Sequence, residues 1–183
     1  QDVSVAVGST AKFTVDASGA DTIQWQSRTE GGAWADIEGA TAASFETATT
    51  SVAQSGTQYR ALATNDGGAS ESLSATLTVT QATPGVKIAV KKNFRFASKT
   101  NATVTVGVPA GVAATGAVTI KAGKTVVGKG AVKGGKAVVT LTKKLRPGKA
   151  NLTAEFVGNA DLTAAKSPVT KVTVKKAAAK VGD

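Results

Sequence analysis

The sequence predicts an all-β protein built from short strands, and three observations support this fold class. Apolar and polar residues alternate over short runs, such as residues 3–7 and 136–142, as they do in strands with one buried face. Glycine is frequent, at 20 of 183 residues, and it falls between these runs, where turns favour it. The hydrophobic fraction is 42% and is rich in valine, a strand-forming residue.

A change of charge in mid-chain divides the sequence into two predicted domains. Three basic and nine acidic residues precede Pro84, whereas nineteen basic and three acidic residues follow from Pro84 onward. The net charges are therefore −6 and +16. A Pro84–Gly85 pair at this point indicates a turn or linker. We predict an acidic domain at residues 1–82, a basic domain at 83–177 and a tail at 178–183.

Strand runs in the first domain lie at residues 3–7, 12–15, 22–26, 59–65 and 72–79. The segments VAVGSTAKFTV, IQWQ and SGTQYRALATNDGG resemble an immunoglobulin-like (Ig-like) domain of bacterial surface proteins. The resemblance implies that Trp25 packs between two sheets and that the Tyr59 hydroxyl bonds to nearby backbone. It also implies that Val15 and Ala61 replace the usual cysteine pair. Trp34 follows a Gly-Gly turn, and it either packs near the core or stacks on a sugar.

Seven strand runs are expected in the second domain, at residues 86–90, 102–108, 116–123, 125–132, 136–142, 150–158 and 170–176. The stretch GAVTIKAGKTVVGKGAVKGGKAVVTLTKKLRPGKANLTAEFVGNADL resembles the bacterial Ig-like repeat of long extracellular proteins. That resemblance implies a structural module with Leu145 and Phe156 in its core. The complete prediction is two tandem Ig-like antiparallel β-sandwiches.

Lysines dominate the second domain, and residues 121–144 contain seven of them without an acidic residue. Strand alternation places them on outward or turn positions, where they also discourage edge-to-edge aggregation. That explanation accounts for the positions of the lysines but not for the excess of positive over negative charge, because a surface designed only for solubility mixes both charges. We therefore consider an anion-binding role for Lys87, Lys91, Lys121, Lys124, Lys129, Lys133, Lys136, Lys143, Lys144, Lys171 and Lys175.

A basic stripe is expected if the first and last strands of this domain are neighbours. It would comprise Lys87, Lys91, Lys171 and Lys175. Suitable partners are an anionic cell-wall polymer, an acidic glycan or an acidic protein surface, including the acidic domain of another copy. Nucleic acid is disfavoured, because Phe94 and Phe96 alone flank a basic residue and no recognition motif is present.

Composition excludes several kinds of chemistry. The chain has no Cys, His or Met, so we expect no disulfide, no thiolate or imidazole metal site and no histidine catalysis. Asp36 and Glu38 straddle one residue and are expected to be solvated rather than catalytic. A Lys–Asn isopeptide bond would draw on Lys87 or Lys91 with Asn151 or Asn159, and its acid, Glu155 or Asp161, is expected to be exposed. No cofactor and no membrane insertion are expected.

We expect a non-catalytic extracellular segment, acting as a stalk, spacer or binding module of a bacterial surface or secreted protein. The chain does not begin with Met, and we expect a mature form or an excised segment. Two alternatives stay open. One is a self-assembling filament, array or phage-decoration subunit. The other is a carbohydrate- or wall-binding accessory module of a larger enzyme, since fold alone does not decide function.

Overall fold

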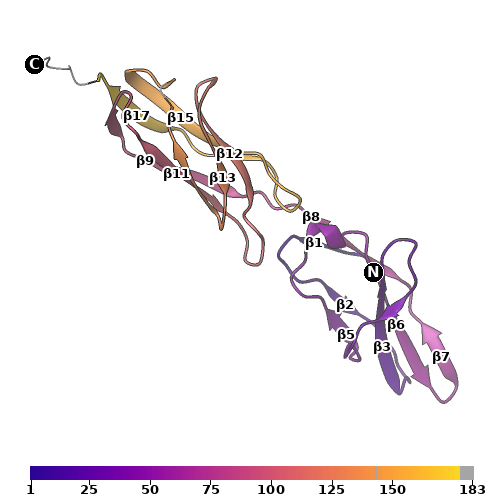
Figure 1. Cartoon of the computed structure of the whole chain (residues 1–183). Helices are drawn as coiled ribbons and strands as arrows, with labels where there is room; N and C mark the ends of the chain where they lie inside the picture. Colours follow the sequence, from indigo (N-terminus) through magenta and orange to yellow (C-terminus); the bar gives the residue numbers. More distant parts are fainter. Residues whose placement is uncertain (143, 178–183) are drawn as a thin grey trace, which may run out of the picture. The chain divides into compact units, whose positions relative to one another are not determined.

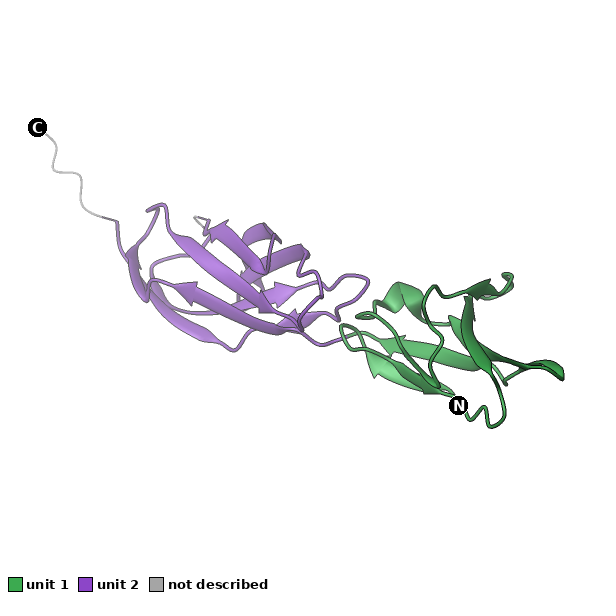
Figure 2. Cartoon of the chain, turned by 90° about the horizontal axis from the view of Figure 1, so that it is seen from below, with its two compact units in different colours: residues 1–81 green, residues 82–183 purple. Residues whose placement is uncertain are grey.

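The computed structural model describes residues 1–142 and 144–177. The chain divides into two compact units, residues 1–81 and residues 82–183 (Figure 2). Regular structure in the described residues consists of strands and one short 3-10 helix, Val52–Gln54. The prediction of an all-β chain is therefore confirmed. Lys143 and the predicted tail, residues 178–183, lie outside the described residues.

The first unit contains two sheets (Figure 1). The larger sheet has the order β1-β8-β6-β3-β4, with β7 paired to β6, and the smaller sheet consists of β2 and β5. Most pairs are antiparallel, but β1 runs parallel to β8. The strands are β1 Val3–Ala6, β2 Lys12–Thr14, β3 Thr22–Arg28, β4 Ala35–Asp36, β5 Ser44–Glu46, β6 Gln58–Asn65, β7 Gly68–Glu71 and β8 Ala75–Thr80.

Aromatic side chains from both sheets fill the core of the first unit. Phe13 of β2 stacks on Tyr59 of β6 at 4.6 Å between ring centroids. Trp25 and Phe45 complete the cluster, and the Trp25 indole donates to the carbonyl of Ala42 at 2.9 Å. Such clustered rings contribute beyond their buried area. The core of this unit is thus aromatic. The sequence predicted no disulfide here, with Val15 and Ala61 in place of the usual cysteine pair.

Two details of the expected core are different. Trp25, Tyr59 and Ala61 are buried, with Trp25 opposite Ala61 in the strand register. Val15, however, is only half-buried, because it lies just beyond the end of β2 at Thr14. Phe13 occupies the fully buried position instead. The expected backbone bond of the Tyr59 hydroxyl is also not formed among the described residues.

The second unit is a sandwich of two sheets (Figure 1). The six-strand sheet has the order β10-β17-β15-β12-β13, with β16 paired to β15, and the three-strand sheet has the order β14-β11-β9. Only the β10–β17 pair is parallel among the described strand pairs of this unit. The strands are β9 Gly85–Val90, β10 Asn93–Arg95, β11 Asn101–Gly107, β12 Gly116–Ala122, β13 Thr125–Val132, β14 Lys136–Thr140, β15 Gly148–Phe156, β16 Ala165–Lys166 and β17 Thr170–Lys175.

The core of the second unit follows the alternation in its strands. Inward valines, leucines and alanines come from both sheets, and Leu145 and Phe156 are buried among them. Gly128 and Gly130 of β13 let the chain approach Val139 of β14. A Cβ added at Gly128 would lie 2.6 Å from a methyl group of Val139. These glycines therefore set the spacing between β13 and β14.

The Pro84–Gly85 pair belongs to the second unit and does not form a free linker. Pro84 is buried, and Gly85 begins β9. Just before them, the Ala82 amide donates to the carbonyl of Asp161, and the Thr163 amide donates to the carbonyl of Ala82. The first residues of this unit are thus fixed to its own 157–164 loop.

Candidate anion-binding site

The candidate lysines of the first and last strands lie on opposite sheets. Lys87 is on β9, which pairs with β11 in the three-strand sheet. Lys171 and Lys175 are on β17, in the six-strand sheet. The expected stripe of Lys87, Lys91, Lys171 and Lys175 is therefore wrong. The reason is that the chain leaves the three-strand sheet after β9, and a separate short strand, β10, pairs with β17.

This crossing of the chain from one sheet to the other creates a different cationic site on the outer face of the six-strand sheet. A surface hollow of about 660 Å³ lies over β10, β17 and β15. We call it the sheet hollow. Three lysines, two asparagines and one threonine supply its polar groups, and no acidic residue lines it. Its lining residues are Lys92, Asn93, Lys149, Ala150, Asn151, Lys171, Val172 and Thr173.

Strand register fixes how these groups are spaced. Thr173 is the cross-strand partner of both Asn93 and Lys149, and Lys171 is the partner of Asn151. Neighbouring strands lie about 4.8 Å apart, and alternate residues on one strand lie about 6.6 Å apart. The backbone positions that carry the lysines therefore span about 10 Å across the sheet, which suits a charged group larger than a single ion.

None of the three lysines of the sheet hollow forms an ion pair within the described part of the chain. Glu155 on β15 is an acid on the same face, and it is engaged elsewhere. Glu155 forms one ion pair with Lys121 of β12. It forms a second with Lys166 of β16, at 3.1 Å between the lysine Nζ and Glu155 Oε1. Hydrogen bonds from Lys121 and then Lys166 hold the pKa of Glu155 below its ordinary value. Lys121 is thus a partner of Glu155 rather than a free cation.

The other candidate lysines are dispersed over the unit. Lys124 and Lys133 are exposed in turns at the two ends of β13, and Lys129 is exposed on β13 itself. Lys136 lies on β14 of the opposite sheet, where Thr105 separates it from Lys87. Lys91 is exposed between β9 and β10, and Lys144 is exposed beyond β14. Of the predicted residues that the structure describes, Lys171 lines the sheet hollow with other cations, and Lys91 lines a second hollow with other cations.

The predicted anion-binding set left out Lys92, Lys149 and the polar groups beside them. Lys149 follows a Pro-Gly turn, and Lys92 follows another lysine, so both resemble ordinary turn residues. They become neighbours only because β10 and β15 lie on either side of β17. The available signal was the phenylalanine pair around Arg95, which indicates a short strand with an inward-facing residue.

Trp34 in the first unit packs against two arginines. The guanidinium carbons of Arg28 and Arg60 lie 4.5 and 4.3 Å from its ring centroid, within the range of a cation–π interaction. Arg60 also forms an ion pair with Glu71, and its Nε donates to Gln26 at 2.8 Å. The ring is half-buried. This arrangement gives Trp34 a packing role on the outer face of the sheet.

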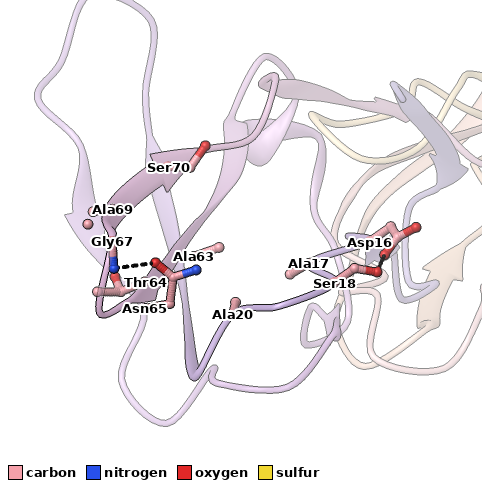
Figure 3. A pocket seen from close by; sticks show the side chains of 11 residues that line it. Asp16, Ala17, Ser18, Ala20, Ala63, Thr64, Asn65, Gly67, Ala69 and Ser70 are labelled. Atoms are coloured by element: carbon pink, nitrogen blue, oxygen red, sulfur yellow. Dashed lines mark hydrogen bonds between the residues drawn. The ribbon is translucent and has the colours of Figure 1, made fainter.

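A second region with a hollow lies in the first unit, and Figure 3 shows it. Small residues of β6, β7 and the 16–20 loop line it, and Asp16 is its one ionisable group. Asp16 accepts a hydrogen bond from Ser18 at 3.2 Å, and Asn65 accepts one from the Gly67 amide at 2.9 Å. These polar groups stabilise turns and do not form a catalytic pair.

The other candidate chemical sites are not assembled. Asp36 is exposed and accepts from Gln26, and Glu38 is exposed. Asn159 donates to the backbone of the 113–115 segment, and Asn151 is exposed beside Lys171. The described residues contain no group of three or more His, Cys, Asp or Glu side chains able to hold a metal ion. They also contain no helix with the length and apolarity needed to cross a membrane.

Fold and site together define a class of all-β protein, a pair of β-sandwich units of which one carries a cationic hollow. Residues 86–175 match the bacterial Ig-like domain (group 3) family, and residues 1–83 match a domain of unknown function (DUF8696). The Ig-like identification of the second unit is thus confirmed. Domains of this kind are structural or accessory modules.

Among curated proteins, the chain is similar to Endoglucanase C of Cellulomonas fimi, with 44% identity over 87 residues. That match covers 46% of this chain and 8% of the relative, so the chain spans a small part of that protein's length. A solved structure described as the fibronectin(III)-like modules of Clostridium thermocellum CbhA covers 96% of this chain and 90% of that chain. Its sequence identity is 15% and its TM-score is 0.38.

Proposed function

We propose that this chain is a non-catalytic spacing and binding module of an extracellular bacterial protein, and that its second unit binds an acidic polymer. The observation that carries the proposal is the sheet hollow, where Lys92, Lys149 and Lys171 meet without a carboxylate. Clustered charge of one sign attracts the opposite charge and raises association rates. A polymer supplies several such charges at once.

The setting of the lysines supports binding rather than a solvated coat. Lys149 and Lys171 stand on β15 and β17, two paired strands in the middle of the sheet order. The backbone there is ordered before any ligand arrives, so binding has to order only the side chains. Asn151 and Thr173 supply neutral hydrogen-bonding groups beside them. Such groups add specificity that charge alone does not give.

The extracellular placement rests on the comparisons. The second unit matches a bacterial Ig-like family, and the curated relative carries the name of a glycan-degrading enzyme. An accessory module in a protein of that kind would hold other domains at a distance and bind an acidic component of the cell surface or of a glycan. The sheet hollow gives this module a contact that a plain spacer lacks.

The test is binding of the full chain to acidic polymers, measured by calorimetry across a salt series. Polyglycerol phosphate and polygalacturonate serve as acidic probes, with a neutral glucan as reference. We expect the double variant Lys149→Gln, Lys171→Gln to weaken binding to at least one acidic polymer about tenfold or more. The slope of the logarithm of the binding constant against the logarithm of salt concentration should fall by the amount that about two charge contacts contribute.

The matched control is Lys124→Gln with Lys133→Gln, which removes the same charge from two turns. Neither of these lysines lines the sheet hollow. If the control pair weakens binding as much as the hollow pair, the effect is one of net charge and the proposal is wrong. Absence of salt-dependent binding to every acidic probe would also contradict it.

A further inference from the structure

A second cationic hollow lies on the other side of β10. Its volume is about 460 Å³, and we call it the turn hollow. Lys91, Arg95 and Lys99 supply its charges, and again no acidic residue lines it. Its lining residues are Lys91, Asn93, Phe94, Arg95, Ser98, Lys99, Thr100 and Asn101.

The two hollows meet at Asn93. This residue lines both of them, and the adjacent residues Lys91 and Lys92 each line one. Asn93 pairs with Thr173 in the strand register. The next pair on the same face, two residues further along both strands, is Arg95 with Lys175. Cationic positions thus continue from Lys171 past Asn93 toward Lys99. The step between outward positions along this route is about 6.6 Å.

The segment that carries the turn hollow is held against the fold. Phe94 and Phe96 pack against the hydrophobic core of the second unit. The Phe96 amide donates to the carbonyl of Lys175 at 2.7 Å. The Ser98 hydroxyl and amide both donate to the carbonyl of Arg95, at 2.6 and 3.2 Å. Anchoring of this kind reduces the entropy lost when a ligand binds.

We propose that the sheet hollow and the turn hollow form one track for a linear phosphodiester polymer whose repeating units are polyols or sugars. This inference rests on the proposed function and names its ligand. Five of the six charges that line the hollows are lysines, which bind phosphate as point charges and lack the fixed fork that arginine presents to carboxylate and phosphate alike. Six cations in two joined hollows suit several successive phosphates rather than one.

Aromatic placement argues against nucleic acid as the occupant. Single-stranded nucleic acid gains much of its affinity from bases that stack on exposed rings. Phe156 is fully buried, and Phe94 and Phe96 are half-buried against the core. Phe94 lines the turn hollow, but the described residues of the second unit include no fully exposed ring on which bases could stack in succession. Its track selects backbone charge without base contacts.

The experiment compares glycerol phosphate oligomers of two lengths, with two and with about eight phosphates, by calorimetry on the full chain at fixed salt. The variant Arg95→Gln, Lys99→Gln removes two charges of the turn hollow, and Lys149→Gln, Lys171→Gln removes two of the sheet hollow. We expect the turn-hollow variant to weaken the long oligomer about fivefold or more and to leave the short oligomer unchanged. The sheet-hollow variant should weaken both.

The outcomes separate the two proposals. If the turn-hollow variant binds the long oligomer like the parent while the sheet-hollow variant loses affinity, the track is wrong and the proposed function stands. If neither variant changes the binding of any acidic probe, both are wrong. Single-stranded DNA with the same number of phosphates is the competing ligand, and equal or tighter binding of DNA would overturn the assignment of ligand class. Unchanged melting temperatures verify that each variant is folded.

Discussion

The main-chain amide of Thr173 donates a 2.7 Å hydrogen bond to the carbonyl oxygen of Lys92. This bond holds the chain against β17 just before β10 begins. It involves only backbone atoms of Lys92, so the position of the residue does not depend on its side chain. The exposed lysine side chain is therefore available for a ligand.

Lys92→Gln should accordingly leave stability unchanged and reduce polymer binding. We expect the free energy of unfolding to change by less than about 0.5 kcal/mol, as is usual for exposed positions. Affinity for the acidic polymer should fall severalfold. Calorimetric unfolding and binding on the same preparation measure both effects. A large loss of stability would show that the side chain has a structural role.

Gly128→Ala should destabilise the second unit. The added Cβ would lie 2.6 Å from Val139 Cγ1 and 3.2 Å from the carbonyl oxygen of Thr140. Overpacking of this kind costs about 1–3 kcal/mol. Gly85→Ala is the control, because nothing lies within 4 Å of its Cβ position. Differential scanning calorimetry should show a lower melting temperature for the first variant alone.

Glu155 should make the second unit sensitive to acid. Its pKa lies below the ordinary 4.5 because Lys121 and Lys166 stabilise the carboxylate. A lowered pKa contributes stability above about pH 4.5, and this contribution is lost as the pH falls through the folded-state pKa. Glu155→Gln should therefore reduce the loss of melting temperature on acidification. Lys129→Gln, on the same face, should leave the pH profile as it is, and an equal effect of both variants would contradict the assignment.

Trp34→Ala should destabilise the first unit without altering polymer binding. The ring contacts Arg28 and Arg60, and we expect a loss of about 1–2 kcal/mol. Trp25 is then the single tryptophan, so its fluorescence reports unfolding of the first unit alone. Leu73→Ala provides a neutral control, since Leu73 is 93% exposed. Loss of binding to a neutral glucan in Trp34→Ala would instead favour a sugar-stacking role.

Tyr59→Phe should cost little at neutral pH. The described residues give the Tyr59 hydroxyl no hydrogen bond, so its removal should change stability by less than about 0.5 kcal/mol. Burial raises the pKa of Tyr59 above 10.0, and a raised pKa means that stability is lost as the pH rises beyond that value. The phenylalanine variant should lose less stability in alkali. A loss well above 1 kcal/mol at pH 7 would reveal a hidden hydrogen bond.

Local patterns predicted most of the strands but not their neighbours. Each of the seven runs expected in the second domain corresponds to an observed strand, because alternation and glycine turns are local signals. The three-residue strand β10 was missed, since its local signal was limited to the phenylalanine pair around Arg95. Its parallel pairing with β17 joins residues about eighty positions apart, and no local rule specifies such a pairing. The sheet hollow depends on that pairing.

The same kind of closure occurs in both units, where an early strand runs parallel to the last one: β1 beside β8 and β10 beside β17. If the two ends of the first unit are pulled apart, β1 and β8 are drawn in opposite directions along their length. Their hydrogen bonds then carry the load together instead of opening one after another. The parallel bridge between Ala82 and Leu162 lies where tension enters the second unit. Parallel pairing of this kind therefore resists force applied along the strands.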